Sequence, residues 1–301
     1  MKNKCLVVIA GPTAVGKTDL SISLAQKLNA AIVSSDARQF YREISIGTAA
    51  PSPNVLKAVP HYLIGHLSIF DYYNVSMFEK QALHTIEALF QHSDFALLVG
   101  GSGLYIDTLC HGIDEMPDPD PSIRKKVQEV YENLGLTGIR QWLNRVDPKY
   151  HAEVDPANHK RILRALEIYL ASGKPFSEFR KSKQTERPFK IVKILVNRPR
   201  QELFQRINAR VVTMIKHGLI EEMLQLYPHR NLNALNTVGY KELFCWMSGR
   251  YPLYTAIEKI KTNTRRYAKR QLTWFNKSAD YKTFEPQEVQ KILDYINACG
   301  T

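Results

Sequence analysis

GPTAVGKT at residues 11–18 has the form G-x-x-x-x-G-K-[ST], and this stretch decides the fold of the chain. The loop follows the apolar run 5–10 and precedes residues 20–25, where apolar residues recur with helical spacing. A buried strand followed by a glycine-rich turn and a helix N-terminus is the setting in which backbone N–H groups bind phosphate. Lys17 adds a positive charge for the outer phosphate, and the Thr18 hydroxyl is placed to bind a Mg²⁺ ion. The sequence therefore predicts a site for a ligand with at least two linked phosphates.

The composition is that of an ordinary globular protein, since 44% of the 301 residues are hydrophobic and 23% are charged. No stretch approaches the ~18 apolar residues of a membrane-spanning helix, and the N-terminus lacks a secretory signal pattern. The cysteines lie far apart and form no C-x-x-C pair, which predicts free thiols and not a disulfide framework or a zinc site. They are Cys5, Cys110, Cys245 and Cys299. We therefore expect a cytoplasmic protein without a membrane partner.

The net charge of +12 is unevenly distributed along the chain. Residues 1–115 carry 8 Lys and Arg against 10 Asp and Glu. Residues 116–190 carry 15 against 10, and residues 191–301 carry 18 against 9. A small diphosphate needs only a few cations, so this excess indicates a polyanionic partner, most simply a nucleic acid. A basic surface that serves only solubility is the alternative explanation.

Apolar strands and helical segments alternate in the first third of the chain. The expected strands are residues 5–10, 31–35 and 95–99, and a long helix is expected over 75–90. Three prolines within residues 116–121 then indicate a linker. After the linker we expect helices at 122–133, 137–145, 158–171, 200–217, 218–226, 239–247 and 253–276, and one further strand at 191–196.

Continuous apolar strands between helices predict a parallel sheet that helices cover on both faces. The predicted architecture is therefore α/β, with a core of the phosphate-loop NTPase type formed by residues 1–115 plus 190–301. Residues 116–189 would form an all-helical insertion domain.

Asp36 follows the second expected strand, and the carboxyl ends of neighbouring strands open onto one crevice in such a sheet. Its carboxylate could act as a general base, as a magnesium ligand, or as the cap of the next helix, and its position alone leaves all three open. The strand that ends at Val99 is followed by Gly-Gly-Ser and not by the Asp that ATP-hydrolysing enzymes of this class use to bind magnesium. This favours a diphosphate that is displaced as a leaving group.

Helix 253–276 is expected to have a basic half and an apolar half. The basic half holds Lys259, Lys261, Arg265, Arg266, Lys269 and Arg270, and no acidic residue lies between 259 and 279. The apolar half holds Ile257, Ile260, Tyr267, Ala268, Leu272, Trp274 and Phe275. Such a helix suits binding of a phosphate backbone, although a solvated face is the alternative. In the insertion, Lys160 and Arg164 lie one helical turn apart, while Ile162, Leu166 and Tyr169 are expected to pack on another face.

Several segments taken together resemble the tRNA dimethylallyltransferase family. They occur in the order of the family over residues 4–280, and several are specific to it. They are residues 11–18 (GPTAVGKT), 35–42 (SDARQFYR), 46–51 (IGTAAP), 98–105 (LVGGSGLY), 161–167 (RILRALE), Arg206-Ile207 with Arg210, Gly218-Leu219, 237–241 (TVGYK) and 268–275 (AKRQLTWF). The family usually has Ser where Ala37 stands and Thr where Ser102 stands. The chain also lacks the cysteines of the C-terminal zinc finger of eukaryotic relatives, so it resembles the bacterial form.

The resemblance implies transfer of a dimethylallyl group from dimethylallyl diphosphate to tRNA, with release of diphosphate. The acceptor would be the exocyclic amine of the adenosine on the 3′ side of the anticodon. Asp36 would accept the proton of that amine, Lys17 and Thr18 would also be catalytic, and Thr18 would contact Mg²⁺. The diphosphate would contact Gly11, Pro12, Thr13, Ala14, Val15, Gly16, Lys17, Thr18 and Arg210. The tRNA would contact Asp36, Ala37, Arg38, Gln39, Ser102, Arg124, Lys160, Arg161, Ile162, Leu163, Arg164, Thr237, Val238, Gly239, Tyr240 and Lys241. A monomer is expected.

Three other functions fit parts of the sequence. An adenylate isopentenyltransferase, which acts on a free nucleotide, would need neither a basic insertion nor a basic helix. A small-molecule kinase that uses ATP would be expected to have the missing strand-end Asp. An RNA-binding module with a vestigial phosphate loop is disfavoured because Lys17 and Thr18 are both present.

Overall fold

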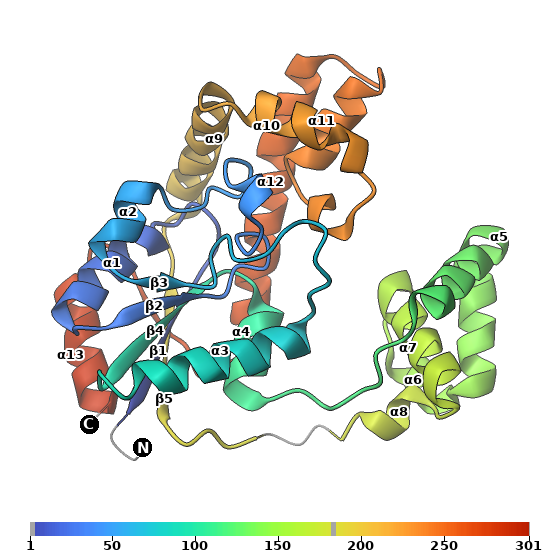
Figure 1. Cartoon of the computed structure of the whole chain (residues 1–301), viewed down its shortest axis with the longest axis horizontal. Helices are drawn as coiled ribbons and strands as arrows, with labels where there is room; N and C mark the ends of the chain where they lie inside the picture. Colours follow the sequence, from blue (N-terminus) through green and yellow to red (C-terminus); the bar gives the residue numbers. More distant parts are fainter. Residues whose placement is uncertain (1–3, 182–184, 301) are drawn as a thin grey trace. The chain divides into compact units, whose positions relative to one another are not determined.

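The computed structural model describes residues 4–181 and 185–300, and its core is a six-stranded sheet (Figure 1). The strands pair in the order β3-β2-β4-β1-β5-β6, and every pair is parallel. Their bounds are β1 Cys5–Ala10, β2 Ala31–Ser34, β3 His61–Tyr62, β4 Phe95–Gly100, β5 Lys190–Val196 and β6 Lys282–Phe284. The prediction of an α/β fold with a parallel sheet is confirmed.

Strand β1 is buried along its whole length because helices cover both faces of the sheet. Leu6, Val8 and Ala10 pack on one face in a cluster that includes residues of α3 and α4. Cys5, Val7 and Ile9 pack on the other face in a cluster that includes residues of α1, α9 and α13. This two-sided burial is the physical reason why the strand reads as a continuous apolar run.

The helices of this core are α1 Lys17–Lys27, α2 Pro53–Ala58, α3 Val75–Leu89, α4 Gly103–His111, α9 Arg200–Lys216, α10 Leu219–Leu226, α11 Tyr240–Met247, α12 Leu253–Phe275 and α13 Val289–Gly300. The helices expected at 200–217, 218–226, 239–247 and 253–276 are confirmed to within one residue at each end. Helix α4 was not expected, because its start lies in a glycine-rich segment that reads as a loop. The carbonyl of Ser102 accepts hydrogen bonds from the N–H groups of Tyr105 and Ile106, which begins the helix there.

The segment between these halves folds as a separate helical unit with its own apolar core. Its helices are α5 Pro121–Val146, α6 Pro148–Glu153, α7 His159–Ser172 and α8 Phe176–Phe179. Gly135 has φ 63° and interrupts α5, so the two expected helices 122–133 and 137–145 lie on either side of it. The Asn158 side chain accepts a hydrogen bond from the N–H of Arg161 and caps the start of α7.

The core and the helical unit divide at His111 and Glu186, not at the expected residues 115 and 190. The second boundary is early because Arg187 is bound to the core. Its guanidinium donates to the carbonyls of Thr108 and Leu109 at the end of α4 and pairs with the Glu79 carboxylate. In residues 4–181 and 185–300, no helix is both long and apolar enough to cross a membrane.

Candidate active site

The loop at residues 11–16 joins β1 to α1 in a conformation that depends on its glycines. Gly11 has φ 154° and Gly16 has φ 109°. A Cβ atom at Gly11 would lie 2.5 Å from the carbonyl oxygen of Val196 on the neighbouring strand β5. The loop is therefore packed against the end of the sheet, and the N-terminus of α1 follows directly at Lys17.

Lys17 is held inside the phosphate loop. Its Nζ atom donates hydrogen bonds to the carbonyl oxygens of Gly11 and Pro12, each at 2.9 Å. Burial lowers the pKa of the Lys17 ammonium to about 8, with Asp36 opposing and Arg210 adding to that shift. An anion bound in the loop would favour the charged form of this side chain.

Three arginines fix the outer side of the loop. Arg210 on α9 donates to the Thr13 hydroxyl at 2.9 Å, and Arg206, one turn earlier, donates to the carbonyl of Ala14 at 2.9 Å. Arg198, just before α9, donates to the carbonyl of Val15 at 2.6 Å. Of the three, only Arg210 was expected here from the sequence. The i, i+4 spacing of Arg206 and Arg210 was the available signal for the second arginine, whereas nothing in the sequence indicated Arg198.

Asp36 lies just beyond the end of β2. One of its carboxylate oxygens, Oδ1, accepts a hydrogen bond from the N–H of Arg38 at 3.0 Å. Residues 37–40 form a turn and no helix begins there, so the helix-cap alternative is wrong. The Arg38 guanidinium donates to the carbonyls of Asn233 and Ala234. Arg38 therefore links the segment after β2 to the segment before α11.

The turn after β4 packs directly against the segment that carries Asp36. The hydroxyl of Ser102 accepts a hydrogen bond from the N–H of Ala37 at 3.0 Å. A Cβ atom at Gly100 would lie 2.2 Å from the Ser35 hydroxyl, so the two segments are in close contact. Ser102 thus keeps the hydroxyl that the family's usual Thr would supply.

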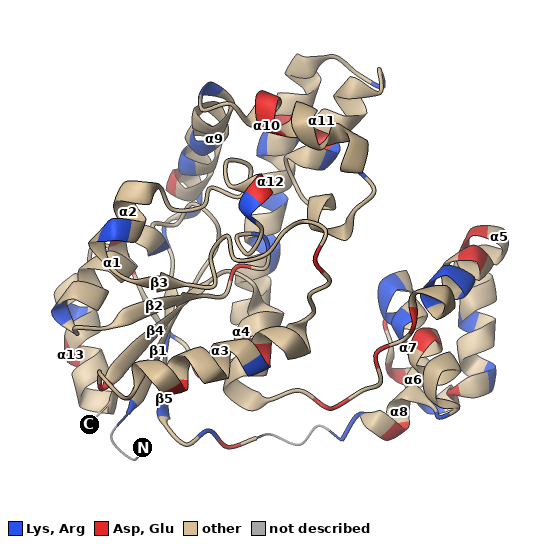
Figure 2. Cartoon of the chain, viewed as in Figure 1, with Lys and Arg blue, Asp and Glu red and all other residues tan. Residues whose placement is uncertain are grey.

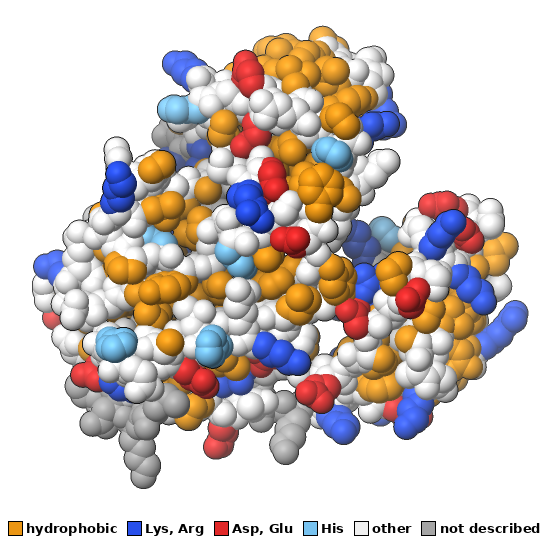
Figure 3. Space-filling view, viewed as in Figure 1, with side chains coloured by type: hydrophobic (Ala, Val, Ile, Leu, Met, Phe, Trp, Pro, Cys, Tyr) orange, Lys and Arg blue, Asp and Glu red, His pale blue; other side chains and the backbone are white. Residues whose placement is uncertain are grey.

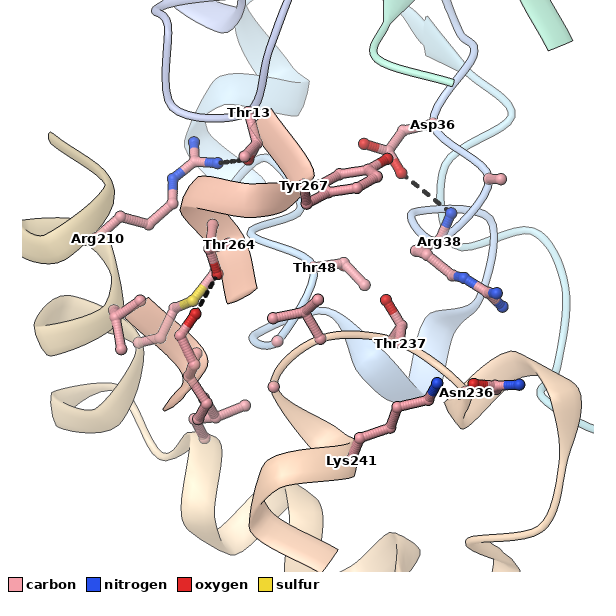
Figure 4. A pocket seen from close by; sticks show the side chains of 18 of the residues that line it. Thr13, Asp36, Arg38, Thr48, Arg210, Asn236, Thr237, Lys241, Thr264 and Tyr267 are labelled. Carbon is pink, nitrogen blue, oxygen red and sulfur yellow. Dashed lines mark hydrogen bonds between the residues drawn. The ribbon is translucent and has the colours of Figure 1, made fainter. Parts of the chain in front are cut away.

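Two cavities open at this end of the sheet. The loop cavity, of about 290 Å³, is lined by residues 13–19 of the phosphate loop and α1, together with Asp36, Thr48 and Arg210. The outer cavity, of about 390 Å³, is lined by residues of α9, α12 and the segment 236–241, and Figure 4 shows it. The two cavities share four lining residues, namely Thr13, Asp36, Thr48 and Arg210. Asp36 therefore faces both the phosphate loop and the outer cavity.

Tyr267 on α12 lines the outer cavity, where its ring lies beside Asp36 (Figure 4). Burial raises the pKa of its hydroxyl, and the Asp36 carboxylate raises it further, so this group stays protonated and can donate a hydrogen bond. The helical pattern of the sequence placed Tyr267 in the buried apolar half of the helix. That assignment was incomplete because helical periodicity does not distinguish a core from the wall of a cavity.

Comparisons with known proteins agree with this arrangement. The family model described as IPP transferase matches residues 39–278, and the one described as isopentenyl transferase matches residues 4–71. A tRNA dimethylallyltransferase of Bacteroides fragilis is 45% identical over 298 residues, which cover 99% of both chains. This chain belongs to the tRNA dimethylallyltransferase family. A second relative with that name, from Porphyromonas gingivalis, is 47% identical and covers 94% of both chains.

Solved structures of the family have the same fold. The tRNA isopentenylpyrophosphate transferase of Bacillus halodurans is 34% identical, with a TM-score of 0.73 and coverage of 99% of this chain and 97% of that one. A eukaryotic dimethylallyltransferase described as acting on tRNA is 28% identical, with a TM-score of 0.80 and coverage of 98% and 77%. The resemblance inferred from the sequence motifs is therefore confirmed, and so is the phosphate-loop NTPase-like core.

The TVGYK segment of the family motif divides between the cavity and the core. Thr237, Val238, Gly239 and Lys241 line the outer cavity. Tyr240 is fully buried, and its hydroxyl donates to the Glu222 carboxylate. The expected contact between the Tyr240 side chain and tRNA is therefore not possible in this structure, because the motif located the segment but not the direction of each side chain.

The helical unit needs a similar correction. Ile162 is fully buried, which confirms the expectation from helical spacing that it packs inside and contradicts its place among the tRNA contacts. Leu163 is nearly fully buried and belongs to the same apolar core. Their side chains are not accessible to tRNA, because they lie on the packed face of α7. Lys160 and Arg161 are exposed. The other two expected contacts are paired with acids, since Arg124 contacts Asp118 at 2.5 Å and Arg164 contacts Glu167 at 3.6 Å.

Helices α9 and α12 carry many of the basic residues of the core (Figure 2). On α12, Lys261 pairs with Glu258 and Arg265 donates to Asn208, so these two belong to internal contacts. The exposed basic residues are Lys259, Arg266, Lys269 and Arg270. A groove beside them is lined by Arg266, Lys269, Arg270, Thr273, Trp274 and Lys277. By comparison, basic side chains on the face of the core drawn in Figure 3 are scattered, and some lie beside acidic ones.

The loop cavity offers oxygen ligands that suit Mg²⁺. Among the described residues, no group of three or more His, Cys, Asp and Glu could hold a metal ion by itself. Thr18 and Asp36 both line the loop cavity and offer only oxygen ligands. Mg²⁺ is usually bound by one or two carboxylates together with substrate phosphates and water, so this donor set fits if a diphosphate supplies the other ligands.

Proposed function

We propose that this protein transfers a dimethylallyl group from dimethylallyl diphosphate to tRNA, at the exocyclic amine of the adenosine 3′ to the anticodon. The observation that carries the proposal is the meeting of the two cavities at Thr13, Asp36, Thr48 and Arg210. A diphosphate in the loop cavity and an adenine in the outer cavity would face each other across these residues. Membership of the tRNA dimethylallyltransferase family supports the same reaction.

The diphosphate would bind to the backbone N–H groups of the loop, to Lys17 and to Arg210. Negative charge accumulates on the leaving diphosphate in the transition state, so fixed positive charges around the loop lower the barrier. Arg206 and Arg198 support the loop by binding its carbonyls. Arg206 and Arg198 therefore stabilise the conformation of the loop and add positive electrostatic potential to the site.

The amine nitrogen of a flipped-out adenine would attack the allylic carbon from the outer cavity. A C–N bond forms while the C–O bond to the diphosphate breaks, and the electron pair of that bond leaves with the diphosphate. The amine proton is transferred to the Asp36 carboxylate, which lies where the cavities meet. Tyr267 and Ser102 would help to hold the nucleoside.

Mg²⁺ is part of the proposal. Thr18 and Asp36 are the residues that would contact the ion, and it would neutralise charge on the diphosphate when bound. Asp36 could thus contribute to both metal binding and proton transfer, and an Asp36→Asn variant separates the two roles.

The tRNA would be bound by the exposed basic residues of both units. Lys160 and Arg161 serve this role in the helical unit, and the groove on α12 serves it in the core. Arg270 lines both the groove and the outer cavity, so a phosphate backbone lying in the groove would lead to the cavity where the base is modified.

The test compares acceptors under identical conditions. The protein is incubated with dimethylallyl diphosphate and Mg²⁺ in the presence of tRNA or AMP, and release of diphosphate is measured. We expect turnover with tRNA only. Turnover with AMP but not with tRNA would favour an adenylate isopentenyltransferase, and tRNA binding without any turnover would favour an RNA-binding module. ATP consumption with a small-molecule acceptor would favour a kinase.

A further inference from the structure

Gln271 on α12 is a buried polar residue that the mechanism described above does not use. Its side chain is 5% exposed, and both ends of its carboxamide are bonded to backbone groups. The Oε1 atom accepts a hydrogen bond from the N–H of Thr13 at 2.9 Å, and the Nε2 atom donates to the carbonyl of Gly101 at 2.9 Å. One side chain therefore joins the phosphate loop to the turn after β4.

The connection continues from Gly101 to Asp36. Ser102, the next residue, accepts a hydrogen bond from the N–H of Ala37 at 3.0 Å, and Ala37 adjoins Asp36. Three hydrogen bonds thus link the loop that would bind the diphosphate to the carboxylate that would receive the proton. Gln271 supplies two of these three bonds, and both depend on its amide group.

The fit around the amide is close. A Cβ atom at Gly101 would lie 2.2 Å from Nε2 of Gln271 and 3.2 Å from the carbonyl oxygen of Gly11. Any larger residue at position 101 would push the amide away from the turn. The three segments are therefore in direct contact here, so a change in the amide group changes their separation.

Packing alone does not account for a glutamine at this position. Burial of an amide is unfavourable unless its donor and acceptor are both satisfied, and an apolar side chain of similar length would fill the same space. The backbone N–H of Thr13 requires an acceptor and the carbonyl of Gly101 requires a donor. Among uncharged side chains of this length, the carboxamide of glutamine offers both at once.

We propose that Gln271 is a positioning residue that fixes the distance between the phosphate loop and Asp36. This inference rests on the proposed function, because the two segments are reaction partners only if the diphosphate leaves as the amine proton reaches Asp36. A displacement of about 1 Å between reacting groups can cost about 10²-fold in rate. Loss of the amide should therefore slow the chemical step with little effect on the binding of either substrate.

The test uses the full-length Gln271→Met variant, which keeps the length of the side chain and removes both hydrogen bonds. We expect kcat to fall by about 10- to 100-fold, while KM for dimethylallyl diphosphate and Kd for tRNA change by less than about threefold. An unchanged kcat in the folded variant would overturn the proposal. It would also be overturned if weaker binding of inorganic diphosphate explained the whole loss.

Phe275→Leu is the matched control for a general loss of stability. Phe275 lies on the same helix, is 1% exposed and lines neither cavity. Its replacement should lower Tm, because it leaves a space in the core, and should leave kcat near the wild-type value. Equal kcat losses in this variant and in Gln271→Met would show that stability alone accounts for the effect, contrary to the proposal.

The Gln271→Glu variant provides a second test, the pH dependence of kcat relative to wild type. This dependence would not change if Gln271 had only a structural role. Its carboxylate can accept from Thr13 N–H but cannot donate to Gly101, whereas the protonated carboxyl group can do both. Burial favours the protonated form. Its kcat relative to wild type should therefore rise as the pH is lowered from about 9 to about 6, while the ratio for Gln271→Met stays flat. A Gln271→Glu ratio that is flat, or that falls at lower pH, would contradict the proposal.

The kcat of each variant is divided by the wild-type kcat at the same pH. This division removes the effect on kcat of the titration of the other charged groups that line the loop cavity with Gln271. These are Lys17, Asp19, Asp36, Arg206 and Arg210. The wild-type measurement also separates the two hypotheses. A wild-type protein that transfers nothing to tRNA would overturn the proposed function together with this inference, whereas an active wild type with an equally active Gln271→Met variant would overturn the inference alone.

Discussion

The hydroxyl of Tyr240 donates a hydrogen bond to the carboxylate of Glu222 at 2.5 Å, inside the core and behind the outer cavity. Glu222 also accepts hydrogen bonds from the N–H groups of Ile46 and Gly47, both at 2.8 Å. A Cβ atom at Gly47 would lie 2.3 Å from the Tyr240 hydroxyl oxygen. The pair therefore holds the segment that carries Thr48 against the cavity.

The first prediction concerns this hydrogen bond. Tyr240→Phe should lower the free energy of unfolding by about 1–3 kcal/mol, because the variant cannot donate to a charged group inside the core. The Kd for tRNA should change by less than about threefold, since the Tyr240 side chain is buried. Denaturant unfolding and tRNA binding measure the two quantities. A large rise in Kd without loss of stability would instead indicate direct contact with RNA.

The second prediction separates the roles of Asp36. Asp36→Asn keeps an oxygen that can accept from the Arg38 N–H, so stability and tRNA affinity should stay near their wild-type values. Turnover should fall by ~10²–10⁴-fold, because the amide cannot accept the amine proton. Single-turnover kinetics and binding of inorganic diphosphate with Mg²⁺ provide the check. Loss of diphosphate binding with intact tRNA binding would show that Asp36 acts mainly as a magnesium ligand.

The third prediction concerns the pH dependence of diphosphate binding. The pKa of Lys17 is lowered to about 8 in the free protein. Above that pH the Lys17 side chain is mostly neutral, so it must take up a proton before its positive charge can attract the diphosphate. The Kd for inorganic diphosphate should therefore rise by up to about tenfold per pH unit above pH ~8. Below pH ~8 the protonation of Lys17 should not change this Kd, because the side chain is already charged. Calorimetric titrations at several pH values measure this dependence.

Lys17→Met is the control for the titration of the diphosphate itself. This variant should bind diphosphate more weakly and catalyse more slowly, because the lysine meets charge in both the ground state and the transition state. The additional rise in Kd above pH ~8 should be absent from it. If wild type and variant show the same pH dependence, Lys17 does not change its protonation on binding.

The fourth prediction divides the basic residues of the helical unit. Replacing exposed Lys160 and Arg161 with Gln should weaken tRNA binding, and the log–log salt dependence should become shallower by a little under one unit for each phosphate that the protein no longer neutralises. The same change at Arg124 and Arg164 should have a smaller effect, because acids already pair with both. Affinity for dimethylallyl diphosphate should not change in either double variant. Equal salt slopes for wild type and both double variants would show that these charged side chains are only solvated and do not contact tRNA phosphates.

The fold could be predicted from the sequence to a large extent, because its strands are continuous apolar runs between helices. Among the elements that were not predicted, β6 and α4 are short, whereas α13 Val289–Gly300 has 12 residues and was missed although its apolar residues recur with helical spacing. Strand β6 has three residues, Lys282–Phe284, and its pairing with β5 depends on residues that are distant in sequence. Helix α4 begins in a glycine-rich segment, so its start is fixed by the Ser102 carbonyl and not by periodicity.

The candidate site could be predicted only where a motif fixes the backbone. The phosphate loop fixes Lys17 and Thr18, and the strand end fixes Asp36. Tyr267 and Gln271 were not identified, because a helix pattern cannot distinguish a side chain in a cavity from one in the core. Tyr240 and Leu163 were assigned to RNA for the opposite reason, since a matching segment does not reveal which way each side chain points.

The most direct test of the central claim is mass spectrometry of nucleosides from tRNA after incubation with the protein, Mg²⁺ and dimethylallyl diphosphate. We predict a C5H8 mass gain on one adenosine, on the 3′ side of the anticodon, with the added group on the exocyclic nitrogen. The Asp36→Asn protein should give little of this product in the same time. An unmodified tRNA, or a mass gain spread over many adenosines, would contradict the account.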